Sequence, residues 1–169
     1  MKFISVATMA LLICLATVSL AQSHKFGHIN SAELLQLMPE IKKADSTLQA
    51  YQKQLEEQNQ TMLNEYQTKV TDYQKNEATM PDAVKDVKQQ EISDLQQRIQ
   101  QFQQTAQDKF QQKKEELYSP ILKKAEDAIK QVAKEHTFSY VFDTSAGSVV
   151  YAQESDDIMP LVKKKLGLK

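Results

Sequence analysis

The chain has 169 residues, of which 25% are charged and 41% hydrophobic, and its formal net charge is −1. This length suits a single domain, and the near-neutral charge argues against general nucleic-acid binding, which needs a basic surface. Glutamine is abundant, with 18 of these residues between positions 49 and 112. Such a stretch is either disordered or a solvated helix, and the spacing of its apolar residues distinguishes the two.

The first 21 residues have the features of a secretory signal peptide. Lys2 provides the positive start, residues 3–20 carry no charge, and Ser19 and Ala21 place small residues where a signal peptidase recognises them. Cleavage is therefore predicted before Gln22. The alternative is an uncleaved membrane anchor, because the 18 uncharged residues reach the lower limit of a span of about 17–25. The single cysteine is Cys14, so the mature chain is expected to have no disulfide and no cysteine-based metal site.

A short strand and a long helix are predicted at the start of the mature chain. Residues 25–30 predict the strand, and Asn30 with Glu33 resembles a capping box that begins a helix. Apolar residues then recur every three or four positions, which is the pattern of a coiled coil, with Gln58 as a polar interruption. This first seam consists of Ile41, Ala44, Leu48, Tyr51, Leu55, Met62, Tyr66, Val70 and Tyr73.

A break at residues 76–82 separates this helix from a second one, which Pro81 is suited to begin. If the chain folds back at Met80–Pro81, residue i faces residue 161 − i, and the two seams are in phase. Pro39 and Pro120 then lie at nearly the same height, where the hairpin leaves its base. Each arm has roughly 40 residues, or about 60 Å. The second seam consists of Val87, Ile92, Leu95, Ile99, Phe102, Ala106, Phe110, Leu117, Ile121, Ala125, Ile129 and Val132.

The last part of the chain changes from helical to strand periodicity. Residues 138–142 are rich in aromatic and β-branched side chains, residues 143–147 predict a turn, and residues 148–151 predict a second strand. Ser155 or Asp156 is expected to cap a short final helix. Three lysines at 163–165 lie near its end, where cations favour the helix dipole.

The predicted fold is α+β and mostly α: a long antiparallel helical hairpin, or coiled-coil arm, on a small β-containing oligomerisation base. Residues 22–169 are expected to form one domain. Residues 22–38 and 121–169 form the base, and residues 39–120 form the arm, with its tip near 76–82. A two-helix hairpin buries too little surface to stand alone, so the base is expected to assemble several copies of the chain.

The chain resembles the Skp/OmpH family of periplasmic chaperones over its whole length. The resemblance rests on the signal peptide, the opening segment 27–35, the hairpin, and the closing segments 140–143, 149–152 and 157–161. It implies a homotrimer whose strands form a shared body, with three hairpins around a cavity that holds unfolded outer-membrane proteins without ATP. Candidates for the oligomer core are Ile29, Tyr140, Phe142, Val149 and Tyr151.

Within this base, Phe142 is expected to be buried. Most aromatic side chains of the seams are expected to pack arm against arm. The candidates for contact with a client are Tyr66, Tyr73 and Met80. Residues 65–94 depart from the basic arms of well-known family members, because four lysines stand against seven acidic residues, a net charge of −3. This charge argues against binding of anionic lipid or lipopolysaccharide.

Enzymatic and metal-binding functions are not indicated. His24, His28 and His136 are the only histidines, and the sequence has no nucleophile elbow, glycine-rich phosphate loop or His/Cys cluster. Neither a catalytic residue nor a cofactor is predicted. After cleavage, His24 is the third residue, an arrangement that can bind Cu(II) or Ni(II) through nitrogen atoms. A frayed terminus without function is the favoured interpretation.

The predicted function is that of an ATP-independent holdase in the periplasm, which binds unfolded outer-membrane proteins and prevents their aggregation in transit. Such clients expose alternating apolar residues and unpaired strand edges, which aggregate in water. The alternative is a structural coiled-coil spacer of the cell envelope. A spacer is expected to bind no unfolded protein.

Overall fold

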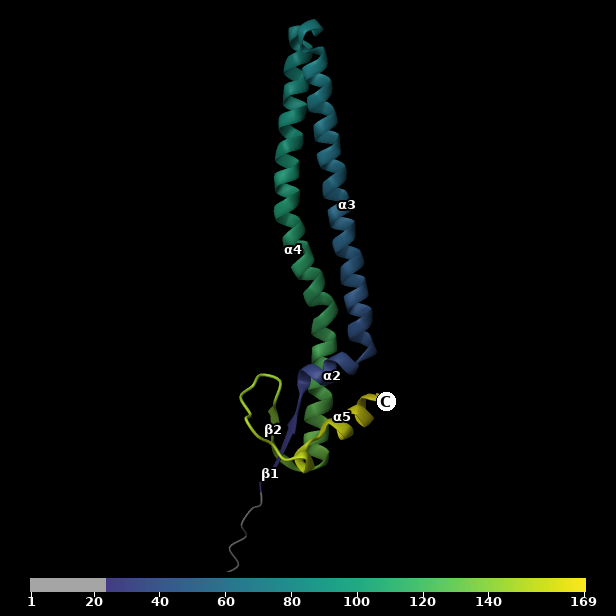
Figure 1. The fold of residues 1–169 in the computed structure, drawn as a ribbon, viewed down its shortest axis with the longest axis vertical. Helices are drawn as coiled ribbons and strands as arrows, with labels where there is room; N and C mark the ends of the chain where they lie inside the picture. Colours follow the sequence, from purple (N-terminus) through teal and green to yellow (C-terminus); the bar gives the residue numbers. More distant parts are fainter. Residues whose placement is uncertain (1–23) are drawn as a thin grey trace, which may run out of the picture.

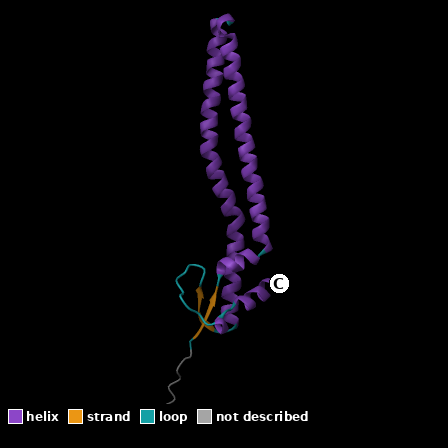
Figure 2. Ribbon diagram, viewed as in Figure 1, coloured by secondary structure: helices purple, strands orange, loops and turns teal. Residues whose placement is uncertain are grey.

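A computed structural model describes residues 24–169, and the predicted signal peptide at 1–21 lies outside the described residues. The chain forms a long helical hairpin on a small base that contains both strands (Figures 1 and 2). This arrangement confirms the predicted α+β, mostly helical fold. In chain order the elements are β1 (Lys25–Ile29), α2 (Ser31–Leu37), α3 (Pro39–Asn76), η1 (Glu77–Thr79), α4 (Asp82–Glu135), β2 (Phe138–Asp143), η2 (Glu154–Asp156) and α5 (Met159–Leu166).

The arm consists of α3 and the first part of α4, and its register agrees with the predicted axis near the tip. Lys69 pairs with Glu91 across the arm, so their numbers sum to 160. Toward the base the register drifts, and Glu40 with Lys124 gives a sum of 164. Although α3 and α4 are long, none of the helices in residues 24–169 is apolar enough over its length to cross a membrane.

The base is built on a two-stranded parallel sheet, in which Gly27 pairs with Val141 and His28 with Phe142. Parallel strands need a long crossover connection, and here the whole hairpin forms that connection. Gly27 lies on the covered face of the sheet. A Cβ atom at this position would lie 3.0 Å from side-chain atoms of Ile158 and Phe138, so a larger residue here would have to push these two side chains aside.

The hydrophobic core lies in the base, between the covered face of the sheet, α2, α5 and the lower part of α4. Eleven of the 13 buried apolar residues within residues 24–169 form this one cluster. Fully burying a large apolar side chain contributes about 1.5–3 kcal/mol, so the base is the best-stabilised part of the chain. The largest fully buried side chains in it are Ile29, Leu34, Met38, Val132, Ile158 and Val162.

The prediction of a strand at residues 148–151 is wrong for the single chain. The segment forms part of the loop between β2 and η2, and Val150 is 99% exposed. A strand needs a neighbour that satisfies its backbone hydrogen-bonding groups. In the described part of one chain, this segment pairs with no strand.

The final helix also begins later than predicted. Ser155 and Asp156 belong to the short helix η2, and α5 starts at Met159. The carboxylate of Asp157 accepts a hydrogen bond from the backbone N–H of Met159 at 2.8 Å. Pro160 fits the first turn, where its missing N–H has no helical partner to lose.

Polar contacts from β2 and from the end of β1 define the start of α2. The side chain of Asn30 accepts a hydrogen bond from the backbone N–H of Glu33 at 3.1 Å, which is one half of the predicted capping box. Asp143 accepts hydrogen bonds from the hydroxyl of Ser31 at 2.5 Å and from the backbone N–H of Ser145 at 2.9 Å. Burial tends to raise the pKa of Asp143, but the hydrogen bonds from Ser31 and Ser145 outweigh it and lower the pKa to about 2.

We expect Asp143→Asn to destabilise the base by about 1 kcal/mol at neutral pH, a small value because water screens this exposed carboxylate. Because the pKa is lowered from 3.8 to about 2, the stabilisation is complete above pH 3.8 and is lost as the pH falls through 2. In thermal melts above about pH 4, the melting temperature of the wild-type chain should be a few degrees higher than that of the variant. Near pH 2 the two melting temperatures should be equal. A difference that does not change with pH would show that the charge is not responsible. Asp108→Asn, on the exposed face of α4, is the matched control.

Candidate functional site

One face of the sheet is covered by the core, and the other is open and aromatic. Strand alternation places Phe26 of β1 and Tyr140 and Phe142 of β2 on the open face, where they are 48%, 60% and 48% exposed. The ring centroids of Phe26 and Tyr140 lie 5.9 Å apart and those of Tyr140 and Phe142 lie 6.4 Å apart, and both pairs are stacked. We call these three residues the aromatic face. Exposed aromatic clusters of this kind are typical of protein–protein interfaces.

The loop after β2 extends this apolar surface. Phe26, Phe142, Val149 and Tyr151 line a common hollow of about 260 Å³. The Nε2 atom of His28 lies 2.9 Å from the carbonyl oxygen of Gln153, and this contact ties the loop to β1. Tyr151 nevertheless is 80% exposed, so the aromatic face and the loop together offer a surface that a second chain can cover.

The structure groups four of the five candidates for the oligomer core. Tyr140, Phe142, Val149 and Tyr151 lie on or beside the aromatic face, whereas Ile29 is only 2% exposed and belongs to the core of its own chain. The expected burial of Phe142 is wrong for the single chain, because the sheet has one covered face and Phe142 lies on the other.

The sequence pattern did not identify Phe26 and Val150 as candidates for the oligomer core. Phe26 could have been found, because it alternates along β1 with the buried Gly27 and Ile29. Nothing in the local pattern distinguishes Val150 from its neighbour Val149, which the structure half-buries.

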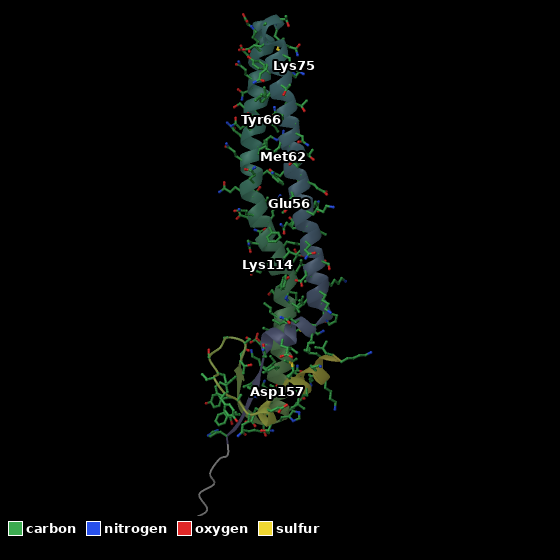
Figure 3. All side chains as sticks on the ribbon, viewed as in Figure 1. Glu56, Met62, Tyr66, Lys75, Lys114 and Asp157 are labelled. Atoms are coloured by element: carbon green, nitrogen blue, oxygen red, sulfur yellow. The ribbon has the colours of Figure 1, made fainter. Side chains whose placement is uncertain are left out.

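The arm is polar on its outer surfaces, and its apolar side chains gather in the seam between α3 and α4 (Figure 3). Tyr66 is half-buried in this seam. Tyr73 is also half-buried, and its hydroxyl accepts a hydrogen bond from Gln89 at 2.6 Å and donates one to Glu77 at 3.2 Å. Met80 is half-buried in the turn. The three candidates for client contact are therefore only partly accessible.

Between residues 39 and 120, the exposed large apolar side chains are Val84 and Val87. Val87 was expected in the seam, and that expectation is wrong. The seam near the tip is instead lined by Lys88 and Ile92, which are half-buried, and the fully buried Leu95 follows. Val87 lies one position from this row and therefore faces solvent.

A salt bridge closes the same part of the seam. Lys69 donates a hydrogen bond to Glu91 at 3.0 Å, and this bond, together with the charge of Lys88, lowers the pKa of Glu91. Because this pair neutralises one lysine and one glutamate, the remaining acidic residues of the tip still outnumber its remaining lysines. The tip therefore presents negative charge to solvent.

The histidines do not form a metal centre within residues 24–169, where no three His, Cys, Asp or Glu side chains gather closely enough to hold an ion. The Nδ1 atom of His24 lies 3.3 Å from the hydroxyl of Ser139, and His136 follows the end of α4. Gln22 and Ser23, which the terminal copper site would also need, lie outside the described residues.

Comparison with known proteins points to one family. The model of a family described as "Outer membrane protein (OmpH-like)" matches residues 25–166, which include the base and the arm. A crystal structure of a protein from Caulobacter crescentus CB15, provisionally assigned as an outer membrane chaperone (OmpH-like), has the same fold. The TM-score is 0.72 at 16% sequence identity, and the alignment covers 85% of this chain and 83% of that chain. No curated protein sequence matches.

Proposed function

The chain belongs to the OmpH-like outer membrane protein family, a family of chaperones rather than enzymes, and from this premise we propose that it is an ATP-independent holdase. It binds unfolded outer-membrane β-barrel proteins in the periplasm and prevents their aggregation on the way to the outer membrane. The observation that supports this proposal is the division of the molecule into a well-packed base with an exposed aromatic face and a long polar arm with little buried surface.

Assembly through the aromatic face would surround a client with several arms. A single copy leaves Phe26, Tyr140, Phe142, Val150 and Tyr151 exposed. An aromatic side chain buries about 150–250 Å² when it is covered, so a shared contact between these faces would stabilise an oligomer. The resemblance to the Skp/OmpH family implies three copies, and we therefore propose a homotrimer with its arms around a central cavity.

Polar arms suit a chaperone that releases its client without an energy source. Glutamine side chains offer donors and acceptors to the unpaired backbone of an unfolded chain, and each such contact contributes little on its own. The cavity separates one client from others, which is what prevents aggregation. The client leaves when its own fold or an insertion partner offers a lower free energy. We propose no lipid partner, because the tip is acidic.

The competing function is a structural spacer, which would use the same hairpin as a rod. A rod is favoured by a continuous buried core along both helices. Here the buried side chains of α3 and α4 are grouped at Leu95 and Ile99, about midway along the arm, and from Ala44 and Ile121 downward at the base. The discontinuous core, together with the family, favours the chaperone.

Light scattering tests the proposal directly. An outer-membrane β-barrel protein is diluted from urea with or without the mature chain, in equimolar amounts per trimer. We expect the chain to suppress most of the scattering. The suppression should change little between low and moderate salt, because the negative tip does not attract clients through long-range basic charge. An unrelated helical protein serves as the control. Unchanged scattering even at tenfold excess would favour the spacer.

A further inference from the structure

The tip of the arm carries an exposed apolar patch. Val84 is 41% exposed and Val87 is 57% exposed, and Pro81 and Ala83 beside them are exposed as well. Residues three or four positions apart are neighbours on a helix surface, so Val87 lies next to Val84 and Ala83. The backbone N–H of Val84 donates a hydrogen bond to the carbonyl oxygen of Pro81 at 2.9 Å, which places Pro81 one turn before it. We call these four residues the tip patch.

The tip patch lies outside the seam between the two helices of the arm. At this level the side chains of α4 that line the seam are Lys85, Lys88 and Ile92, which are half-buried. The valines of the patch lie outside this row, and α3 leaves them uncovered. Figure 1 shows that the tip is the part of the arm farthest from the base. A folded protein can therefore reach the patch without touching the base.

Acidic side chains flank the patch on α4. Asp82 and Asp86 are four positions apart, so they form a row next to the row of Ala83 and Val87. Asp94 follows Val87 by seven positions, which is about two helical turns, and so lies on the same side of the helix. The patch is therefore apolar at its centre and negative at its edge.

Most of this negative charge is not neutralised within the chain. Three of the four lysines in residues 65–94 are held in ion pairs of the arm, and these pairs are Lys69 with Glu91 at 3.0 Å, Lys88 with Glu91 at 3.5 Å and Lys85 with Asp82 at 3.3 Å. The side chain of Asp82 is still 96% exposed in its pair. Within residues 24–169, neither Asp86 nor Asp94 pairs with a basic side chain, and both are exposed. These carboxylates are therefore available to a cationic partner.

We propose that the tip patch is a docking surface for a basic amphipathic segment of a partner protein, in which an apolar row lies between lysine or arginine side chains. Charge complementarity selects this partner. The valines cover its apolar row, and the carboxylates of Asp82, Asp86 and Asp94 attract its cations. This contact is separate from client holding, because client holding is expected to depend little on salt, whereas docking at the acidic tip should weaken as salt rises.

The same charges oppose two other occupants of the patch. The tip of a second copy carries the same acidic residues, so the two tips repel each other. The headgroups of an anionic lipid surface are repelled for the same reason. A segment that is both apolar and basic gains from both parts of the surface.

Fluorescence anisotropy of labelled peptides tests this docking surface with the full mature chain. The probe is a helical peptide of leucine and lysine, about five turns long, with its leucines on one face. The control peptide has glutamate in place of lysine. We expect the chain to bind the lysine peptide at least tenfold more tightly than the glutamate peptide, and to bind it less tightly as salt rises. Equal binding of the two peptides would overturn the proposal.

Paired variants locate the binding on the tip. Val84→Ser with Val87→Ser should weaken binding of the lysine peptide at least fivefold, and Asp86→Asn with Asp94→Asn at least threefold at low salt. The matched control is Glu56→Gln with Asp108→Asn, which removes two exposed carboxylates from the arm below the tip and should change nothing (Figure 3 labels Glu56). Circular dichroism confirms that each variant stays helical.

Three further results would reject the tip patch as this docking surface. Variants of the tip that bind the peptide as tightly as the wild-type chain would show that it binds elsewhere. Binding of the wild-type chain to vesicles of phosphatidylglycerol and phosphatidylcholine, lost in the valine variant, would identify a membrane as the occupant. Loss of aggregation suppression in the valine variant would identify the client as the occupant. If the wild-type chain suppresses no aggregation but binds the lysine peptide at the tip, the holdase function alone is rejected.

Discussion

Removal of most of the arm should abolish client holding and leave assembly intact. The variant lacks residues 49–112, and a short glycine-rich turn joins Leu48 to Lys113. About 32 residues of each helix are lost, or roughly 48 Å, which includes the tip and most of the seam between α3 and α4. The contacts of Tyr118 with Asp45 and of Lys124 with Glu40 remain at the base of the arm. We expect suppression of aggregation at least tenfold weaker than wild type, measured by light scattering, at an unchanged number of chains per oligomer in native mass spectrometry.

A shorter deletion is the matched control for this experiment. Removing Met62 to Ile99 takes away about 19 residues of each helix and keeps the lower half of the arm. It should therefore retain more activity than the longer deletion. If the longest deletion still holds its client fully, the arm is not the holding surface. If it no longer assembles, the base alone does not determine the oligomer.

Loss of the aromatic face should convert the oligomer to single chains. In Tyr140→Ser with Phe142→Ser, both changes fall on the open face of the sheet, so each chain should keep its fold and melting transition. Aromatic residues at the centre of an interface cost about 2 kcal/mol or more when truncated, so the two changes should weaken assembly roughly a thousandfold. Sedimentation at micromolar concentration should then give the mass of one chain.

Leu122→Ser is the control for the base variant. Leu122 on α4 is 48% exposed, the same fraction as Phe142, but it lies away from the aromatic face. Its replacement should leave the oligomer mass unchanged. An unchanged mass for the Tyr140 and Phe142 variant would show that copies meet elsewhere.

The arm was predictable because its signal is local and repeated. Two seams with a spacing of three or four residues, broken at Pro81, are enough to place the turn and the facing residues near the tip, such as Lys69 and Glu91. The error at Val87 shows the limit of this method. A shift of one position turns a side chain by about 100° around the helix axis, which moves it from the seam to solvent.

The base was less predictable because its pairing is not local. β1 and β2 are separated by more than 100 residues. The sequence pattern predicts where strands form but not which strands pair with each other. Residues 148–151 have strand composition but no partner in the single chain. Phenylalanine is a residue type that is usually buried in a core, but Phe142 lies on the face of the sheet that a single chain leaves open. Both errors concern groups that we expect assembly to cover.

The candidate site was only partly predictable for the same reason. Tyr66 and Tyr73 were chosen by residue type and position, but accessibility depends on how closely two helices approach, and heptad spacing does not report this distance.

Native mass spectrometry of the mature chain mixed with one urea-unfolded outer-membrane β-barrel protein tests the central claim most directly, because it reports assembly and holding together. We expect one dominant complex that contains three copies of the chain and one client, with no ATP present. Free single chains beside an aggregated client, or an intact oligomer that never carries a client, would contradict the account.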